Sequence, residues 1–254
     1  MWLPTGKVEP PTTRVGRGPD RTWPHSGALL LLVLLVSAMV AVTGCGTGTG
    51  TGTGPTGDPA PALAGGDSGG SGASGGLVMI IRHGEKPSGS TPGVDARGNR
   101  DPSSLTDVGW NRAHRLVDLF NPADGRLRPG LARPAAIYAA GANNNGEGAR
   151  TRETVTPLAD KLGIPLDTSF GKGDEKALVS RVTSQPGPTL IAWQHGEIPL
   201  IAKAFPSVTP TPPAQWPDNR FDVIWTFTKT PDGWHFAQLP ELVLPQDQPG
   251  VIGN

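Results

Sequence analysis

The residues Arg82-His83-Gly84-Glu85 place a guanidinium and an imidazole side by side directly after the apolar run of residues 77–81. Five apolar residues after two glycines predict a short buried strand. In open α/β sheets, ligands bind beyond the carboxyl ends of the strands, which is where Arg82 and His83 would lie. An arginine offers a planar fork to an anion, and an imidazole is a nucleophile near neutral pH. The pattern therefore predicts an oxyanion site at this sheet edge.

A second histidine repeats the arrangement, because His195 follows the apolar residues 189–193. Arg150 begins a predicted helix after another apolar run, residues 135–140, and its side chain could reach the same edge. Two arginines and two histidines suit a dianionic phosphoryl group, since each arginine can bind its oxygens with two hydrogen bonds. One imidazole could attack phosphorus while the other stabilises the moving charge. We expect a phosphate pocket formed by Arg82, His83, Arg150 and His195.

A leaving alkoxide needs a proton, which a carboxyl group within hydrogen-bond reach could supply. Glu85 and Glu197 lie next to the two histidines in the sequence and are the nearest candidates. Asp174 and Glu175 are also available. The sequence does not choose among them.

The elements that must position these residues alternate between strand and helix patterns. The expected strands cover residues 77–81, 135–140, 189–193, 221–229 and 234–244, and the expected helices about 107–120, 150–162, 174–184 and 198–205. Thr106 is a plausible N-cap, and Gly163 a stop signal. Pro157 conflicts with the interior of its helix. This order predicts an α/β fold, a three-layer α/β/α sandwich with a largely parallel central sheet and a C-terminal antiparallel hairpin.

Other reactive or bulky residues have ordinary interpretations. We expect His114 to share a solvated helix face with Arg112 and Arg115, and His235 to face outward from its strand. The tryptophans of the predicted strands are expected in the core: Trp193, Trp225 and Trp234. No His/Cys/Asp cluster has metal-ligand spacing, and we expect no metal or other cofactor. The net charge of zero argues against a nucleic-acid partner.

Four motifs, in order along the chain, carry a family resemblance: Arg82-His83-Gly84; Leu105-Thr106-x-x-Gly109-x-x-Arg112-Ala113; Tyr138-Ala139-Ala140 followed by Arg150-x-x-x-Thr154; and Trp193-x-His195-Gly196. At these residues the chain resembles the histidine phosphatase superfamily, the phosphoglycerate-mutase-like enzymes. The resemblance implies that a phosphomonoester phosphorylates His83. It also implies that Arg82, Arg150 and His195 form the phosphate pocket, without a metal.

The chain departs from the family's mutases at Glu85-Lys86-Pro87-Ser88, and from its phytase branch at Gly196 after the second histidine. It therefore resembles the small phosphatase branch. The polar 141–148 loop makes Arg152 a competitor for Arg150, although the spacing to Thr154 favours Arg150. Two alternatives stay open: a surface-anchored phospho-ligand binding protein with little turnover, and a phosphoglycerate-type mutase. Specificity would lie in loops 86–104 and 206–220, which carry no readable substrate motif.

The first 45 residues resemble a signal peptide. Residues 28–42 form an uncharged apolar stretch of 15 residues, short for a bilayer-spanning helix, with arginines upstream. Val42-Thr43-Gly44-Cys45 then resembles a bacterial lipobox, and Cys45 is the chain's one cysteine. We expect lipidation of Cys45 and anchoring on the extracytoplasmic face of the cell membrane. An uncleaved membrane anchor is the alternative.

Residues 46–76 consist almost wholly of Gly, Thr, Ser, Pro, Ala and Asp. Because the segment has few apolar side chains, their burial cannot offset the entropy cost of ordering it. We therefore expect a disordered linker. The catalytic domain is then residues 77–254, which is long enough for a sound core.

Overall fold

The computed structural model describes residues 76–141 and 148–253. The predicted signal peptide with Cys45, nearly all of the predicted linker and most of the 141–148 loop lie outside these residues. The strands are β1 (Leu77–Arg82), β2 (Ala136–Ala139), β3 (Leu166–Asp167), β4 (Thr189–Trp193), β5 (Val208–Thr209), β6 (Val223–Thr230) and β7 (Gly233–Pro240). The helices are α1 (Asp107–Phe120), α2 (Ala149–Leu162), α3 (Glu175–Ser184) and α4 (Ile198–Ala204).

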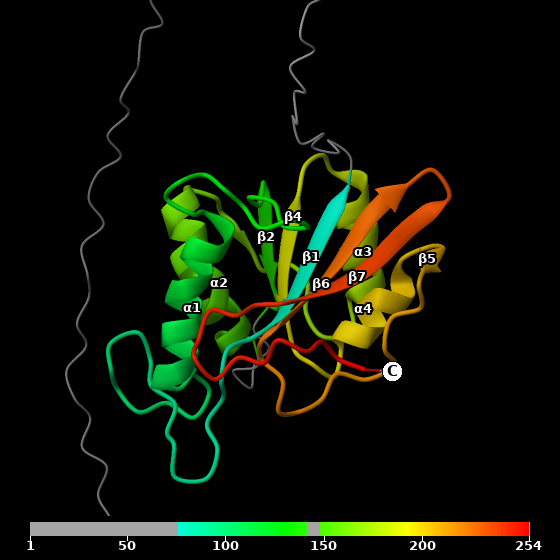
Figure 1. Cartoon of the computed structure of the whole chain (residues 1–254). Coiled ribbons are helices and arrows are strands. Elements are labelled where there is room, and N and C mark those ends of the chain that lie inside the picture. Colours follow the sequence, from blue (N-terminus) through cyan, green and yellow to red (C-terminus); the bar gives the residue numbers. More distant parts are fainter. Residues whose placement is uncertain (1–75, 142–147, 254) are drawn as a thin grey trace, which may run out of the picture. The chain divides into compact units, whose positions relative to one another are not determined.

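The strands form one sheet in the order β3-β2-β4-β1-β6-β7-β5 (Figure 1). Strands β3, β2, β4 and β1 are parallel to one another, whereas β6 pairs antiparallel with both β1 and β7. Helices α1 and α2 cover one face, and α3 and α4 the other. The predicted fold, a three-layer sandwich with a largely parallel sheet and a C-terminal hairpin, is confirmed.

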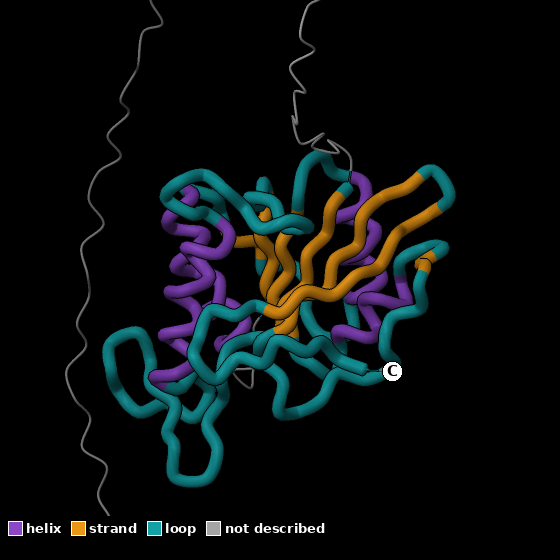
Figure 2. Tube along the Cα trace, in the orientation of Figure 1, coloured by secondary structure: helices purple, strands orange, loops and turns teal. Residues whose placement is uncertain are grey.

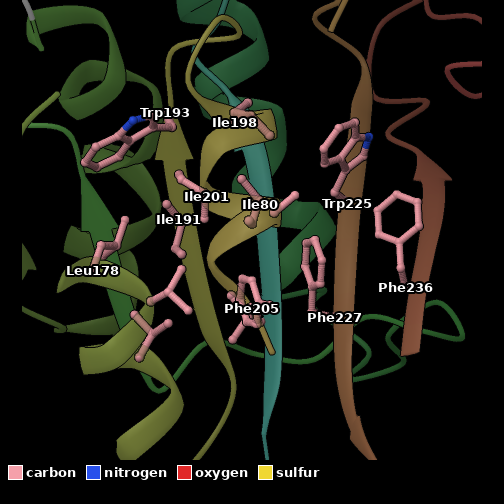
Figure 3. Close-up of a cluster of buried hydrophobic side chains, with 14 of the residues drawn as sticks. Ile80, Leu178, Ile191, Trp193, Ile198, Ile201, Phe205, Trp225, Phe227 and Phe236 are labelled. Carbon is pink, nitrogen blue, oxygen red and sulfur yellow. The ribbon is translucent and has the colours of Figure 1, made fainter. Parts of the chain in front are cut away.

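The continuous apolar runs of β1 and β4 follow from burial on both faces of the sheet. Val78 and Ile80 point to the cluster under α3 and α4, and Met79 and Ile81 to the cluster under α1 and α2. The first of these clusters is rich in aromatic rings (Figure 3). There Phe205 stacks on Phe227 with ring centroids 4.4 Å apart. The three tryptophans expected in the core are buried.

The long loops that follow β1 and precede β6 lie at the edge of the sheet where β1 and β4 end (Figure 2). Thr106 caps α1 as predicted, because its hydroxyl accepts a hydrogen bond from the Gly109 amide at 3.2 Å. Gly163 ends α2 in the left-handed conformation, with φ 65°. Thr106 therefore fixes where α1 begins, and Gly163 fixes where α2 ends.

Three expectations differ from the structure. The two-residue strands β3 and β5 were not predicted, since strands this short leave no periodic pattern. Helix α2 continues through Pro157, although its nitrogen cannot donate the helical hydrogen bond, because burial of Val155 and Leu158 holds the helix in place. Arg112 is not on a solvated face: it is 1% exposed, whereas His114 and Arg115 are exposed as expected.

None of the helices within residues 76–141 and 148–253 is long and apolar enough to cross a membrane.

Candidate active site

His83 stands at the carboxyl end of β1, and only 3% of it is exposed. Its amide donates to the Trp193 carbonyl at 3.1 Å, which joins the loop after β1 to the end of β4. Its Nδ1 lies 2.7 Å from the Gly84 carbonyl oxygen. A carbonyl only accepts, so Nδ1 carries the hydrogen, and the lone pair of the neutral ring is on Nε2. Burial lowers the pKa of His83 to about 3, helped by the charges of Arg82 and Arg150, so the ring is neutral.

Gly84 and Thr154 explain the spacing of two motifs. The Gly84 amide donates to the Thr154 hydroxyl at 2.8 Å, and that hydroxyl donates to the Arg150 carbonyl at 2.7 Å. A side chain on Gly84 would place its Cβ 2.9 Å from the Gly109 carbonyl oxygen, at the start of α1. The loop after β1 that carries His83 is therefore held between the first turns of α1 and α2.

Arg82 is completely buried beneath this loop. Its Nη1 donates to the carbonyls of Pro217, Asp218 and Arg220 at 3.3, 2.7 and 2.9 Å. Its guanidinium also lies 3.8 Å from the centre of the Phe221 ring. Burial lowers the pKa of Arg82 to about 10, so it keeps its charge at neutral pH. Its Nε and Nη2 have no hydrogen-bond partner among the described residues.

Arg150 lies in the first turn of α2, as predicted. Its Nη1 donates to the carbonyls of Pro102 and Ser103 at 3.3 and 3.1 Å, while its buried Nε has no partner in the described part of the chain. A cavity of about 100 Å³ is lined by His83, Gly148, Arg150, Thr151, Lys172 and Gln194. Arg152 is not among these residues. The amino end of a helix favours anions, so α2 adds to the positive field of Arg150 here.

His195 follows β4 and is held by a residue that sequence reasoning missed. Its Nε2 lies 2.6 Å from Oδ1 of Asp218, in the loop before β6. Its Nδ1 is buried and has no partner among the described residues. Burial and the charge of Arg82 lower the pKa of His195, whereas Asp218 raises it. No sequence pattern marks Asp218, because its position depends on the path of an irregular loop.

Arg82, Arg150 and His195 all lie close enough to His83 to act on its charge. The structure therefore brings together the four residues predicted for the phosphate pocket. Arg82 and His195 do not line the small cavity itself, and both contact Asp218 in the loop before β6.

The candidate proton donors are occupied in other interactions. Glu85 forms a 2.7 Å ion pair with Arg112, and Glu197 forms one with Lys172, also at 2.7 Å. Asp174 accepts from the Gly171 amide, and Glu175 from the Gly173 amide. The general acid stays a prediction with several candidates.

The Glu85–Arg112 pair belongs to a buried charge cluster. Arg112 also pairs with Glu241 at 2.6 Å and with Asp247 at 2.7 Å, both beyond β7. Burial raises the pKa of the wholly buried Glu241 to about 8, although Arg112 opposes that shift. This cluster joins the segment after β7 to the loop after β1, and its partners are too far apart in the sequence for any local pattern.

A second, more open cavity of about 480 Å³ lies beside the site. It is lined mainly by the loops after β1 and before β6: Glu85, Lys86, Ser88, Thr91, Thr106, Val108, Asp218, Asn219, Phe221 and Gln246. These include both loops in which specificity was expected. Within residues 76–141 and 148–253, no group of three or more His, Cys, Asp or Glu side chains is placed to hold a metal ion.

No protein-family model matches the chain, and no curated protein matches its sequence. Solved structures do match it. One is the protein histidine phosphatase SixA complexed with tungstate, at 16% identity and TM-score 0.41, covering 65% of this chain and 97% of that one. Another is a mycobacterial glucosyl-3-phosphoglycerate phosphatase, at 11% identity and TM-score 0.39, covering 64% and 96%. The first is a histidine phosphatase by name, and the second is a phosphatase by name.

Proposed function

We propose that this chain is a phosphatase of the histidine phosphatase superfamily that hydrolyses phosphomonoesters through a phosphohistidine on His83. The observation that carries the proposal is the fixed tautomer of His83. Its Nδ1 hydrogen is committed to the Gly84 carbonyl at 2.7 Å, so the nucleophilic lone pair is on Nε2 of a ring that lines the Arg150 cavity.

In the first step, Nε2 of His83 attacks phosphorus, the N–P bond forms, and the P–O bond to the alcohol breaks. The donors on Arg82 and Arg150 that have no partner among the described residues suit the phosphoryl oxygens. The leaving oxygen takes a proton from a carboxyl group or from water. The ring needs no prior deprotonation, because its low pKa keeps it neutral throughout the physiological range.

In the second step, a water oxygen attacks phosphorus, the N–P bond breaks, and His83 returns to its neutral form. The proton of the attacking water leaves with the phosphate or passes to a nearby base. The open cavity next to Asp218 and Phe221 gives the alcohol a place to bind and leave, with water entering behind it.

The experiment is phosphoenzyme trapping with a labelled phosphomonoester. The wild type should form an acid-labile, base-stable adduct on His83, and turnover should lie several orders of magnitude above that of His83→Ala. His114→Ala, a change at an exposed histidine, is the matched control and should behave like wild type. Full activity of His83→Ala would exclude the covalent route. Binding of phosphate without turnover would favour the binding-protein alternative.

Product analysis separates a phosphatase from a mutase. A phosphatase releases inorganic phosphate in proportion to substrate consumed, whereas a mutase returns the phosphoryl group to a second hydroxyl of the same substrate class. The sequence departures at Glu85-Lys86-Pro87-Ser88 support the phosphatase. Isomerised phosphoglycerate as the main product would overturn this choice.

We further propose that the mature protein is anchored by lipid on Cys45, on the extracytoplasmic face of the membrane. Support comes from the sequence alone: a short apolar segment followed by a lipobox-like Val42-Thr43-Gly44-Cys45. In a bacterial host, the full chain should incorporate labelled fatty acid, and Cys45→Ser should not. Cys45→Ser should keep its phosphatase activity, since the predicted site lies within residues 82–218. Equal labelling of both proteins would reject lipidation at Cys45.

A further inference from the structure

We infer that Asp218 is a positioning residue that fixes the tautomer of His195 and favours its charged form, so that Nδ1 of His195 donates a hydrogen bond to the phosphoryl group. The inference rests on the proposed function, because it assigns a role within that site. Asp218 itself would not touch the reacting atoms.

The first argument is the orientation of the His195 ring. Nε2 faces the Asp218 carboxylate at 2.6 Å, and a carboxylate accepts, so Nε2 carries a hydrogen. Nδ1 on the opposite side is buried and has no partner among the described residues. A neutral ring with its hydrogen on Nε2 would present a lone pair from Nδ1. It can donate to a phosphoryl oxygen only as the imidazolium.

The second argument is the balance of charge around His195. Burial lowers the pKa of His195, as do the charges of Arg82 and Lys86, and Asp218 opposes that lowering without cancelling it. A dianionic phosphoryl group would add negative charge on the Nδ1 side. The imidazolium would then lie between two anions, Asp218 on one side and phosphate on the other, which is the arrangement that favours proton uptake.

The third argument is that the protein fixes the position of Asp218 through its backbone. Arg82 donates to the Asp218 carbonyl at 2.7 Å and to the carbonyls of Pro217 and Arg220. Trp216 Nε1 donates to the Arg220 carbonyl at 2.9 Å, closing the same loop. Arg82 therefore contributes to the position of both histidines. It is the last residue of β1, next to His83, and it binds the loop whose Asp218 contacts His195.

Because of these contacts, a substitution of Asp218 can remove its charge without removing the hydrogen bonds that hold the loop. The Asp218 side chain is 83% exposed, and Arg82 contacts its carbonyl rather than its carboxylate. Asp218→Asn should therefore leave folding and the loop anchor intact while removing the charge. Asp218→Glu keeps the charge and serves as the conservative variant. Asp232→Asn, an exposed aspartate in the turn between β6 and β7, is the matched control.

The first measurement is the affinity for inorganic phosphate, by calorimetry at pH 6.5. If Asp218 acted only through its net charge, removing it would tighten binding of an anion. A positioning role predicts the opposite: Asp218→Asn should bind phosphate about tenfold more weakly, and Asp218→Glu should recover most of that loss. Tighter binding by Asp218→Asn would overturn the inference.

The second measurement is ¹⁵N NMR of the His195 ring, assigned with His195→Gln, as a function of pH and phosphate. In the phosphate complex, the wild type should show both ring nitrogens protonated up to a higher pH than Asp218→Asn does. Identical titrations of the two proteins would also overturn the inference. This readout needs no turnover, so a protein without phosphatase activity could still pass it, and the proposed function would then fail alone.

The third measurement is the pH profile of kcat/KM. Asp218→Asn should lower kcat/KM about 10- to 100-fold, and its alkaline limb should shift to lower pH, because His195 loses its proton sooner. Asp218→Glu should restore the limb, and Asp232→Asn should match the wild type. A uniform loss with an unshifted limb would indicate a merely structural role.

Discussion

The two histidines of the site are held in opposite ways. His83 is almost wholly buried, and its tautomer is fixed by the carbonyl of its own neighbour, Gly84. His195 is partly exposed, and its partner is the side chain of Asp218 in a distant loop. The first arrangement is built into the strand end, whereas the second depends on where a loop folds.

Because of this difference, substitutions of side chains should affect His195 more than His83. A backbone carbonyl holds His83 whatever the surrounding side chains are, so the tautomer of the proposed nucleophile does not depend on them. The state of His195 depends on a side chain that a single substitution can replace. If the proposed function holds, substitutions in the loop before β6 would change how the phosphoryl group is held and leave the tautomer of His83 unchanged. The same loop also lines the open cavity in which substrate specificity was expected.

The largest expected effect comes from removing the cation of the charge cluster that holds Glu85, in the loop after His83. Arg112→Met would leave Glu85, Glu241 and Asp247 without their shared cation. Breaking a buried ion pair by removing one partner typically costs about 3–5 kcal/mol. We expect a loss of that size in the free energy of unfolding, measured by urea denaturation. Arg115→Met, at an exposed position of the same helix, is the control and should change it by less than about 0.5 kcal/mol.

If Arg112→Met is as stable as the control, Arg112 contributes nothing to the free energy of unfolding through this cluster, and the prediction fails. A fallback keeps the comparison testable if the variant does not fold: Asp247→Asn removes one of the three carboxylates and keeps Glu241 paired. It should be less destabilising than Arg112→Met, because two partners of Arg112 are retained.

The next effect tests whether Arg150 or Arg152 serves the site. Arg150→Ala removes a donor next to His83, and loss of one transition-state donor costs roughly 10²–10³ in kcat. Arg152→Ala, in the same helix turn but outside the cavity, should stay within about twofold of wild type. Initial rates on one phosphomonoester decide the matter. The reverse order of effects would show that the predicted register of this helix was wrong.

The parts of the fold and site that could be predicted are those encoded locally. The apolar run of β1 ending at Arg82-His83 was enough to predict a buried strand with chemistry at its end, and Thr106 and Gly163 marked helix ends through their own backbone requirements. The spacing from Arg150 to Thr154 also proved structural, since Thr154 links Arg150 to Gly84.

What could not be predicted depends on contacts between distant segments. Arg112 resembled a surface arginine because its partners, Glu241 and Asp247, lie 129 and 135 residues away. Asp218 had no signal for the same reason, since irregular loops follow no period. The position of Asp218 depends on three backbone carbonyls that accept hydrogen bonds from Arg82. Every residue has a backbone carbonyl, so this contact leaves no mark in the sequence.

The smallest predicted effect concerns stability against pH, and it sharpens the contrast between the two histidines. His83 has a pKa of about 3 in the folded chain and an ordinary value of 6.5 when unfolded. Between these values the unfolded chain binds a proton that the folded chain does not, so the free energy of unfolding falls as pH decreases. One group contributes at most about 1.4 kcal/mol per pH unit.

His83→Gln should remove this contribution, so its stability should fall less steeply than that of wild type between pH 6.5 and 4. His195→Gln should flatten the curve less, because His195 is less buried and Asp218 opposes the lowering of its pKa. His114→Gln is the exposed control, and urea unfolding at four pH values gives all the slopes. Equal slopes for wild type and His83→Gln would show that His83 is not held neutral by burial, which would remove the contrast on which the roles of the two histidines depend.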